Sequence, residues 1–116
     1  MSSSNARTGD MRRSQRLQVS GTIRAIDRRT RDEVGKIVNI SADGIMLLGE
    51  QPVEENSILE LVLVYGEAGT ETIAVGVESL WCHSSDDQRR FWSGHYIIDI
   101  SEPDLERLLG LASPRP

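Results

Sequence analysis

The chain has 116 residues, of which 38% are hydrophobic and 27% charged, and its formal net charge is −5. This length accommodates one hydrophobic core and excludes a second domain, and the apolar content excludes a wholly disordered chain. No apolar run is long enough to cross a bilayer, the N-terminus lacks the apolar centre of a secretory signal, and the single Cys82 excludes an internal disulfide. We therefore expect one cytoplasmic domain without membrane insertion.

The charge is distributed unevenly along the chain. Residues 1–31 carry eight arginines and two aspartates, a net charge of +6, whereas residues 32–116 carry a net charge of −11. A basic N-terminal segment on an acidic body favours an anionic ligand held by that segment. A nucleic-acid polymer would need basic groups over a broad face, so the charge pattern argues against it. A merely solvated basic tail is the alternative that composition alone leaves open.

The apolar pattern predicts six strands. Residues 1–10 are small and polar, and we expect them to be a disordered tail. Apolar side chains then alternate with polar ones, beginning at Leu17, as in a half-buried strand. The expected strands, separated by turn residues, cover residues 17–25, 34–40, 45–48, 58–65, 73–81 and 91–100. Gly94, inside the last of them, is typical of a bulge or a close approach of two segments.

The period changes to that of a helix after the last strand. Ser101 is a suitable N-cap, Pro103 fits the first turn, and Leu105 and Leu108 then share one face. These features predict a helix over residues 102–111, followed by a tail at 112–116. Together the elements predict a mainly β fold, a six-stranded antiparallel β-barrel over residues 11–111 closed by a C-terminal α-helix.

The first of two short motifs is rich in arginine. We expect residues 11–16 to form an N-terminal arm before the first strand, and this arm contains Arg12, Arg13 and Arg16. A guanidinium bonds bidentately to a phosphate or to the edge of guanine, and it also stacks on a base. Lysine supplies the charge without the planar fork, so this arginine pattern favours recognition of a nucleotide.

The second motif follows about two dozen residues later and contains Asn39, Ser41 and Gly44. The Asn39 amide can both donate and accept at a base edge, and the Ser41 hydroxyl can donate to a phosphate or bond its own turn. Gly44 lets a flat ligand approach the backbone, and the Asp43–Gly44 pair predicts a tight turn with positive φ. The alternative is an ordinary hairpin turn, which uses the same residue types.

The order and spacing of R-x-x-x-R and N-x-S-x-x-G resemble those of the PilZ domain, a family that binds the bacterial second messenger cyclic di-GMP. The resemblance covers about residues 11–110 and includes the last two strands and the helix. Its one departure is Ile97, where an aromatic residue is expected. The resemblance implies a split-barrel type of fold and a ligand site without cofactor or metal. The implied ligand-binding residues are Arg12, Arg13, Arg16, Asn39, Ser41 and Gly44.

The resemblance also implies a mechanism. The arm would order over cyclic di-GMP and so change a surface that an unidentified downstream protein reads, which makes the chain a stand-alone adaptor. We expect a monomer or a weak homodimer. The alternative function is an interaction module of the same fold that binds no nucleotide. A barrel that binds single-stranded RNA is disfavoured, because the chain has only five aromatic residues and an acidic body.

No pattern indicates catalysis or a metal centre. Cys82, His83 and His95 lack a recognised ligand spacing, and two pairs of adjacent carboxylates fall in polar loops where solvated acidic pairs are common. No nucleophile motif or phosphate-binding glycine loop is present. We therefore predict that the chain is not an enzyme. Trp81 and Trp92 are interpreted as core or rim residues, with stacking on a ligand as the less favoured role.

Overall fold

The computed structural model describes residues 17–18 and 21–112 of the chain. Seven strands, one short 3₁₀ helix and one α-helix are assigned in this part. In chain order they are β1 (Leu17–Gln18), β2 (Arg24–Asp27), β3 (Glu33–Ile40), β4 (Gly44–Gly49), β5 (Ile58–Tyr65), η1 (Glu67–Gly69), β6 (Glu71–Ser84), β7 (Phe91–Asp99) and α1 (Glu102–Leu111).

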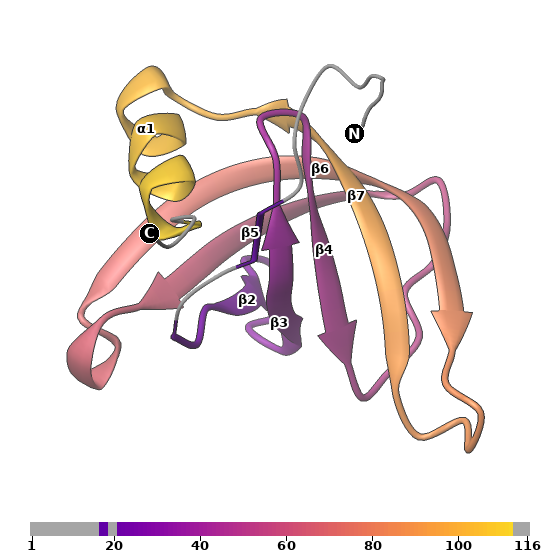
Figure 1. Ribbon diagram of the computed structural model, residues 1–116. Coiled ribbons are helices and arrows are strands. Elements are labelled where there is room, and N and C mark those ends of the chain that lie inside the picture. Colours follow the sequence, from indigo (N-terminus) through magenta and orange to yellow (C-terminus); the bar gives the residue numbers. More distant parts are fainter. Residues whose placement is uncertain (1–16, 19–20, 113–116) are drawn as a thin grey trace, which may run out of the picture.

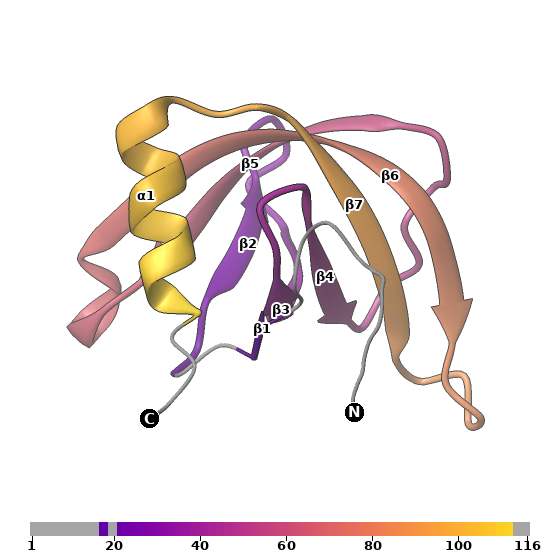
Figure 2. The same cartoon turned by 45° about the horizontal axis from the view of Figure 1, so that its top comes forward.

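Six of the strands form a closed antiparallel barrel. The sheet runs in the order β3, β2, β5, β6, β7, β4, and β4 pairs again with β3. The short β1 is an additional strand paired with one end of β3. The long β6 curves over the barrel, and α1 stands against it (Figure 1; Figure 2). The predicted six-stranded barrel with a C-terminal helix is therefore confirmed.

The segment predicted as one strand from residue 17 to residue 25 is instead two strands, β1 and β2. Between them Gly21 adopts φ 82°, a left-handed conformation that only glycine takes readily and that turns the chain. Both strands pair with β3, Leu17 opposite Ile40 and Arg24 opposite Lys36. The alternation of apolar and polar residues continues across the break, which explains why the pattern concealed it.

A β-bulge interrupts the alternation of inward and outward side chains within β3. Strict alternation along this strand would place Val38 and Ile40 on one face and Ile37 and Asn39 on the other. The register with β4 shifts between Ile37 and Asn39, so that Ile37 and Ile40 are both buried in the core. One inserted residue reverses the alternation beyond it. As a result Asn39 lies on the outer surface of the barrel, only partly buried.

The barrel interior is filled by aliphatic side chains, and α1 covers it. Leu108 and Ala112 are fully buried in the core with the strand residues. The Ser101 side chain caps the helix by accepting a hydrogen bond from the Asp104 N–H at 3.2 Å, as predicted. Ala112, which the sequence analysis assigned to the tail at 112–116, is buried in this core, and residues 113–116 lie outside the described residues. Ile97, the departure from the family pattern, is partly buried against the same core.

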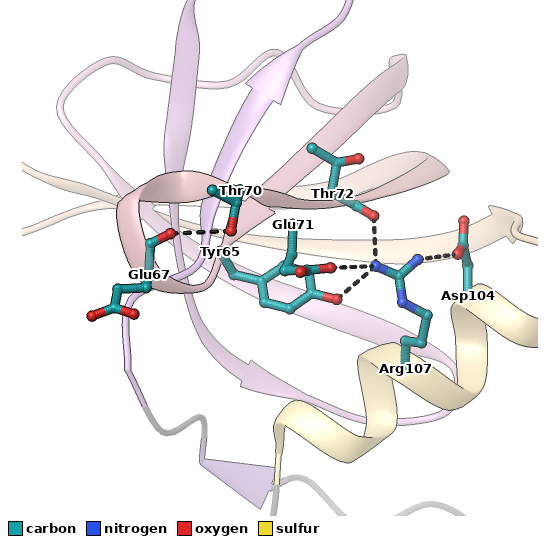
Figure 3. A network of polar contacts seen from close by, with 7 residues as sticks. All are labelled: Tyr65, Glu67, Thr70, Glu71, Thr72, Asp104 and Arg107. Carbon is teal, nitrogen blue, oxygen red and sulfur yellow. Dashed lines mark hydrogen bonds and ion pairs between the residues drawn. The ribbon is translucent and has the colours of Figure 1, made fainter.

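Polar contacts of Arg107 link the outer side of α1 to the end of the β5–β6 hairpin (Figure 3). Its guanidinium Nη2 donates to the Tyr65 hydroxyl at 2.8 Å and to the Thr72 carbonyl at 3.0 Å. Ion pairs at 3.5 Å to Glu71 and 2.9 Å to Asp104 complete the network. The hydrogen bond to Tyr65 is the main cause that raises the pKa of Arg107 above its ordinary value. The helix is thus held by apolar burial inside and by one arginine outside.

Candidate functional site

The turn between β3 and β4 is organised by the Ser41 side chain. Ser41 Oγ accepts hydrogen bonds from the backbone N–H groups of Asp43 at 3.3 Å and Gly44 at 3.2 Å. The Ser41 N–H in turn donates to the Gly44 carbonyl at 2.9 Å. With 2% of its surface exposed, Ser41 directs its hydroxyl into the turn. Of the two uses proposed from the sequence, the structure therefore displays the bond to its own turn.

Gly44 is required by the packing of β4 against β7. A Cβ at this position would collide with the backbone carbonyl oxygen of His95. The expected positive φ is wrong, since the described glycines with positive φ are Gly21, Gly66 and Gly69. The Asp43 carbonyl also accepts a hydrogen bond from the Ile97 N–H at 2.8 Å. The motif turn is consequently bonded to β7 at two successive residues.

A row of side chains crosses the outer surface from β3 to β6 beside this turn. Asn39 pairs with Met46, Met46 with Gly94, and Gly94 with Trp81. Directly opposed residues of antiparallel strands share a face, so the side chains of Asn39, Met46 and Trp81 point outward together, with Gly94 between the last two. The Asn39 amide donates to the Met46 sulfur at 3.3 Å. We call Asn39, Met46, Gly94 and Trp81 the Asn39–Trp81 row.

The Trp81 indole occupies the space above Gly94. A Cβ on Gly94 would overlap Nε1 and Cε2 of this ring, so the close approach predicted for Gly94 is confirmed. Trp81 is partly exposed and lies 5.2 Å from the His83 ring, centroid to centroid. The sequence favours a core or rim position for Trp81 over a ligand-facing one. The interior Gly94 was the sequence signal for a large side chain packed above it. Which side chain this is follows from the pairing of β6 with β7, which the sequence does not give.

The predicted arginines, Arg12, Arg13 and Arg16, lie outside the described residues. The described chain begins with Leu17, which pairs with Ile40, the residue before Ser41. One peptide unit spans about 3.8 Å between Cα atoms, so the covalent link from Arg16 enters the described structure beside the motif turn. Asn39, Ser41 and Gly44 are brought together there, and the contribution of the arginines stays a prediction.

His95, a fully buried histidine of β7, lies next to the turn without belonging to the row. Its Nε2 is 2.8 Å from Ser93 Oγ, and its Nδ1 is buried with no hydrogen-bond partner among the described residues. Burial lowers the pKa of His95 to about 4. In the described part of the chain no group of three His, Cys, Asp or Glu side chains is placed to hold a metal ion. Cys82, one of the three residues considered as metal ligands from the sequence, accepts a hydrogen bond from the Val53 N–H at 3.4 Å.

The buried His95 makes stability depend on pH. The folded protein holds this imidazole neutral, whereas the unfolded chain protonates it near its ordinary pKa of about 6.5. Its contribution is therefore complete above pH 6.5 and is lost as the pH falls toward 4. Between pH 7 and pH 4.5 we expect a loss of about 2 kcal/mol in the free energy of unfolding, measured by urea denaturation. His95→Leu should remove that part of the pH dependence, and an unchanged slope in this variant would contradict the assignment.

The PilZ domain family model matches residues 10–112. The chain belongs to the PilZ domain family. Solved structures of similar fold include the PilZ domain of Escherichia coli YcgR with c-di-GMP. That pair has a TM-score of 0.66 and 10% sequence identity, and the alignment covers 89% of each chain.

Two further structures come from longer proteins. The Bacillus subtilis inhibitor of motility MotI/DgrA has a TM-score of 0.64 at 17% identity, covering 87% of this chain and 49% of its own. The K. pneumonia MrkH complex with c-di-GMP has a TM-score of 0.62 at 18% identity, covering 87% of this chain and 50% of its own. The chain thus spans about half the length of both, and at these identities the likeness shows the fold. No curated protein gives a significant match.

No helix in residues 17–18 and 21–112 is both long and apolar enough to cross a membrane.

Proposed function

We propose that this PilZ protein binds cyclic di-GMP beside the β3–β4 turn and works in the cytoplasm as an adaptor. The observation that carries this proposal is the Asn39–Trp81 row, which lies beside the motif turn at the end of β3 that pairs with β1, the strand that follows Arg16. Family membership supports the same ligand class. The structures of YcgR and of MrkH with c-di-GMP share the fold.

The row suits the chemistry of a guanine base. A base offers donors and acceptors at its edge, which the Asn39 amide can match, and an apolar face, which an indole and a thioether can cover. Stacking of a base on an aromatic ring is worth about 1–3 kcal/mol. Trp81 and Met46 are therefore proposed to receive the face of one guanine, with Asn39 at its edge. Ser41 and Gly44 support this arrangement by fixing the turn.

The phosphates of the ligand require positive charge that the row does not supply. Asn39, Met46 and Trp81 are neutral, and residues 32–116 together carry a net charge of −11. We propose that Arg12, Arg13 and Arg16 supply this charge through bidentate bonds to phosphate and guanine. The arm at residues 11–16 would then order over the ligand and present a changed surface to a downstream protein.

The intrinsic fluorescence of Trp81 tests this arrangement. In a Trp92→Phe variant, which leaves Trp81 as the single tryptophan, cyclic di-GMP should quench or shift the emission saturably because a base stacks on the indole. Trp81→Ala should weaken nucleotide binding about tenfold, the equivalent of about 1.4 kcal/mol. An emission spectrum that stays constant while nucleotide binds would place the base elsewhere on the barrel.

The alternative is a PilZ-fold interaction module that binds no nucleotide. The same titration separates the two, since GTP serves as the matched nucleotide control. If neither cyclic di-GMP nor GTP changes the emission or the melting temperature of the protein, the interaction-module reading replaces the sensor reading.

A further inference from the structure

Exposed apolar side chains surround a carboxylate on the outer surface of β5, β6 and β7. Ile58, Tyr96 and Ile98 are 66%, 49% and 45% exposed. Ile58 pairs with Glu78 and Glu78 with Tyr96, so these three stand in one line across three strands on the same face. Ile98 extends the patch along β7, its Cγ1 3.8 Å from where a Cβ on Gly76 would stand. We call Ile58, Glu78, Tyr96 and Ile98 the Tyr96 face.

Glu78 places a negative charge at the centre of this apolar face. Its side chain is partly buried between Ile58 and Tyr96 and forms no hydrogen bond or ion pair within the part of the chain that the structure describes. Two more carboxylates, Glu60 and Asp99, border the face across Gly76. Covering a carboxylate with an apolar surface is costly unless a cation pairs with it. Whatever covers the Tyr96 face must therefore bring a positive charge to its centre.

We propose that the Tyr96 face docks a separate protein, through a segment that places a lysine or arginine against Glu78 and apolar side chains on Ile58, Tyr96 and Ile98. The role of the Tyr96 face as the output surface of a sensor rests on the proposed function. Tyrosine and aliphatic side chains around a desolvated charge pair are typical of the energetic centre of an interface. A second copy of this chain is a poor occupant, because a two-fold contact centred on this face would bring Glu78 against its own copy.

The position of the face couples it to the ligand site. Tyr96 pairs with Gly44 of the motif turn, and the next residue, Ile97, donates its N–H to the Asp43 carbonyl at 2.8 Å. A ligand that binds at the turn can therefore alter β7 where Tyr96 projects. By reciprocity, a partner docked on the Tyr96 face must change the nucleotide affinity by the same factor as nucleotide changes partner affinity.

A library of random 12-residue peptides displayed on phage, selected on the immobilised full-length protein, tests the proposal. Selected peptides should contain lysine or arginine next to apolar residues. As synthetic peptides they should lose at least about tenfold in affinity for Tyr96→Ala and for Glu78→Lys, the loss expected at an interface centre. The matched controls are Trp92→Ala, at an exposed position of the same strand, and Glu67→Lys, the same charge change on η1. Both should bind like the wild type. A peptide whose basic residue is replaced by Glu should regain binding to Glu78→Lys.

Three outcomes would overturn this inference: no enriched peptide, enriched peptides without basic residues, or equal binding to Tyr96→Ala and the wild type. A Tyr96-dependent homodimer in sedimentation would overturn the choice of occupant. Failure of the nucleotide proposal is distinguishable, because each protein is also titrated with cyclic di-GMP alone. If the wild type binds no nucleotide and the peptides still require Tyr96 and Glu78, the docking surface stands without the sensor.

Discussion

Arg16→Ala is expected to weaken the binding of cyclic di-GMP about a hundredfold, which corresponds to about 2.7 kcal/mol. Among Arg12, Arg13 and Arg16 it is the one next in sequence to Leu17, which pairs with Ile40 immediately before the motif turn. Loss of a bidentate, charge-assisted pair to a phosphate typically costs this much. Equilibrium dialysis against radiolabelled cyclic di-GMP measures the effect.

The matched control for Arg16→Ala is Arg29→Ala. Arg29 is an exposed arginine in the β2–β3 connection, and its removal changes the net charge equally. Its loss should change the affinity less than about threefold, because only long-range electrostatic attraction is reduced. Equal losses in the two variants would mean that the arm contributes nonspecific charge and no ligand contact.

Gly44→Ala is expected to lower the free energy of unfolding by about 3 kcal/mol. The added methyl group would collide with the His95 carbonyl oxygen, which is backbone inside a paired strand and cannot rotate aside. Relief requires β4 and β7 to separate beside the motif turn. Urea denaturation measures this loss, and nucleotide affinity should fall as well, because the turn is displaced.

Gly110→Ala is the matched control for Gly44→Ala. A Cβ on Gly110 meets nothing within 4 Å, and the residue lies within α1. Alanine is the better helix former, so this variant should gain about 0.5–1 kcal/mol. Wild-type stability in Gly44→Ala would show that the barrel yields at this contact, and the structural role assigned to Gly44 would be wrong.

The sequence predicted the elements that depend on local pattern. The period of two located the strands from β3 to β7, and the Ser101 cap with Pro103 located α1 at its observed bounds. These features are local because strand alternation and helix capping act within a few residues. The break at Gly21 and the bulge before Asn39 were not predicted, because neither changes the pattern of apolar residues in a distinctive way.

The candidate site was predictable in part. Asn39, Ser41 and Gly44 were identified from their spacing, and the hydrogen bonds of Ser41 within its own turn were one of the two uses expected for it. The contact of Gly44 with the backbone carbonyl of His95 was not predicted. This contact depends on β7, which lies about fifty residues further along the chain. Trp81 was ranked low for the same reason, since its place in the row follows from the register of four strands.

Calorimetric titration of the protein with cyclic di-GMP, with GTP as the control ligand, decides whether the chain binds this nucleotide. The proposed site predicts saturable heat with cyclic di-GMP, none with GTP, and weaker binding at higher salt because the arginines meet phosphates. The titration also gives the number of ligands per chain. Absence of heat and of any thermal shift at high micromolar nucleotide would contradict the claim, and the protein would then be a PilZ-fold interaction module.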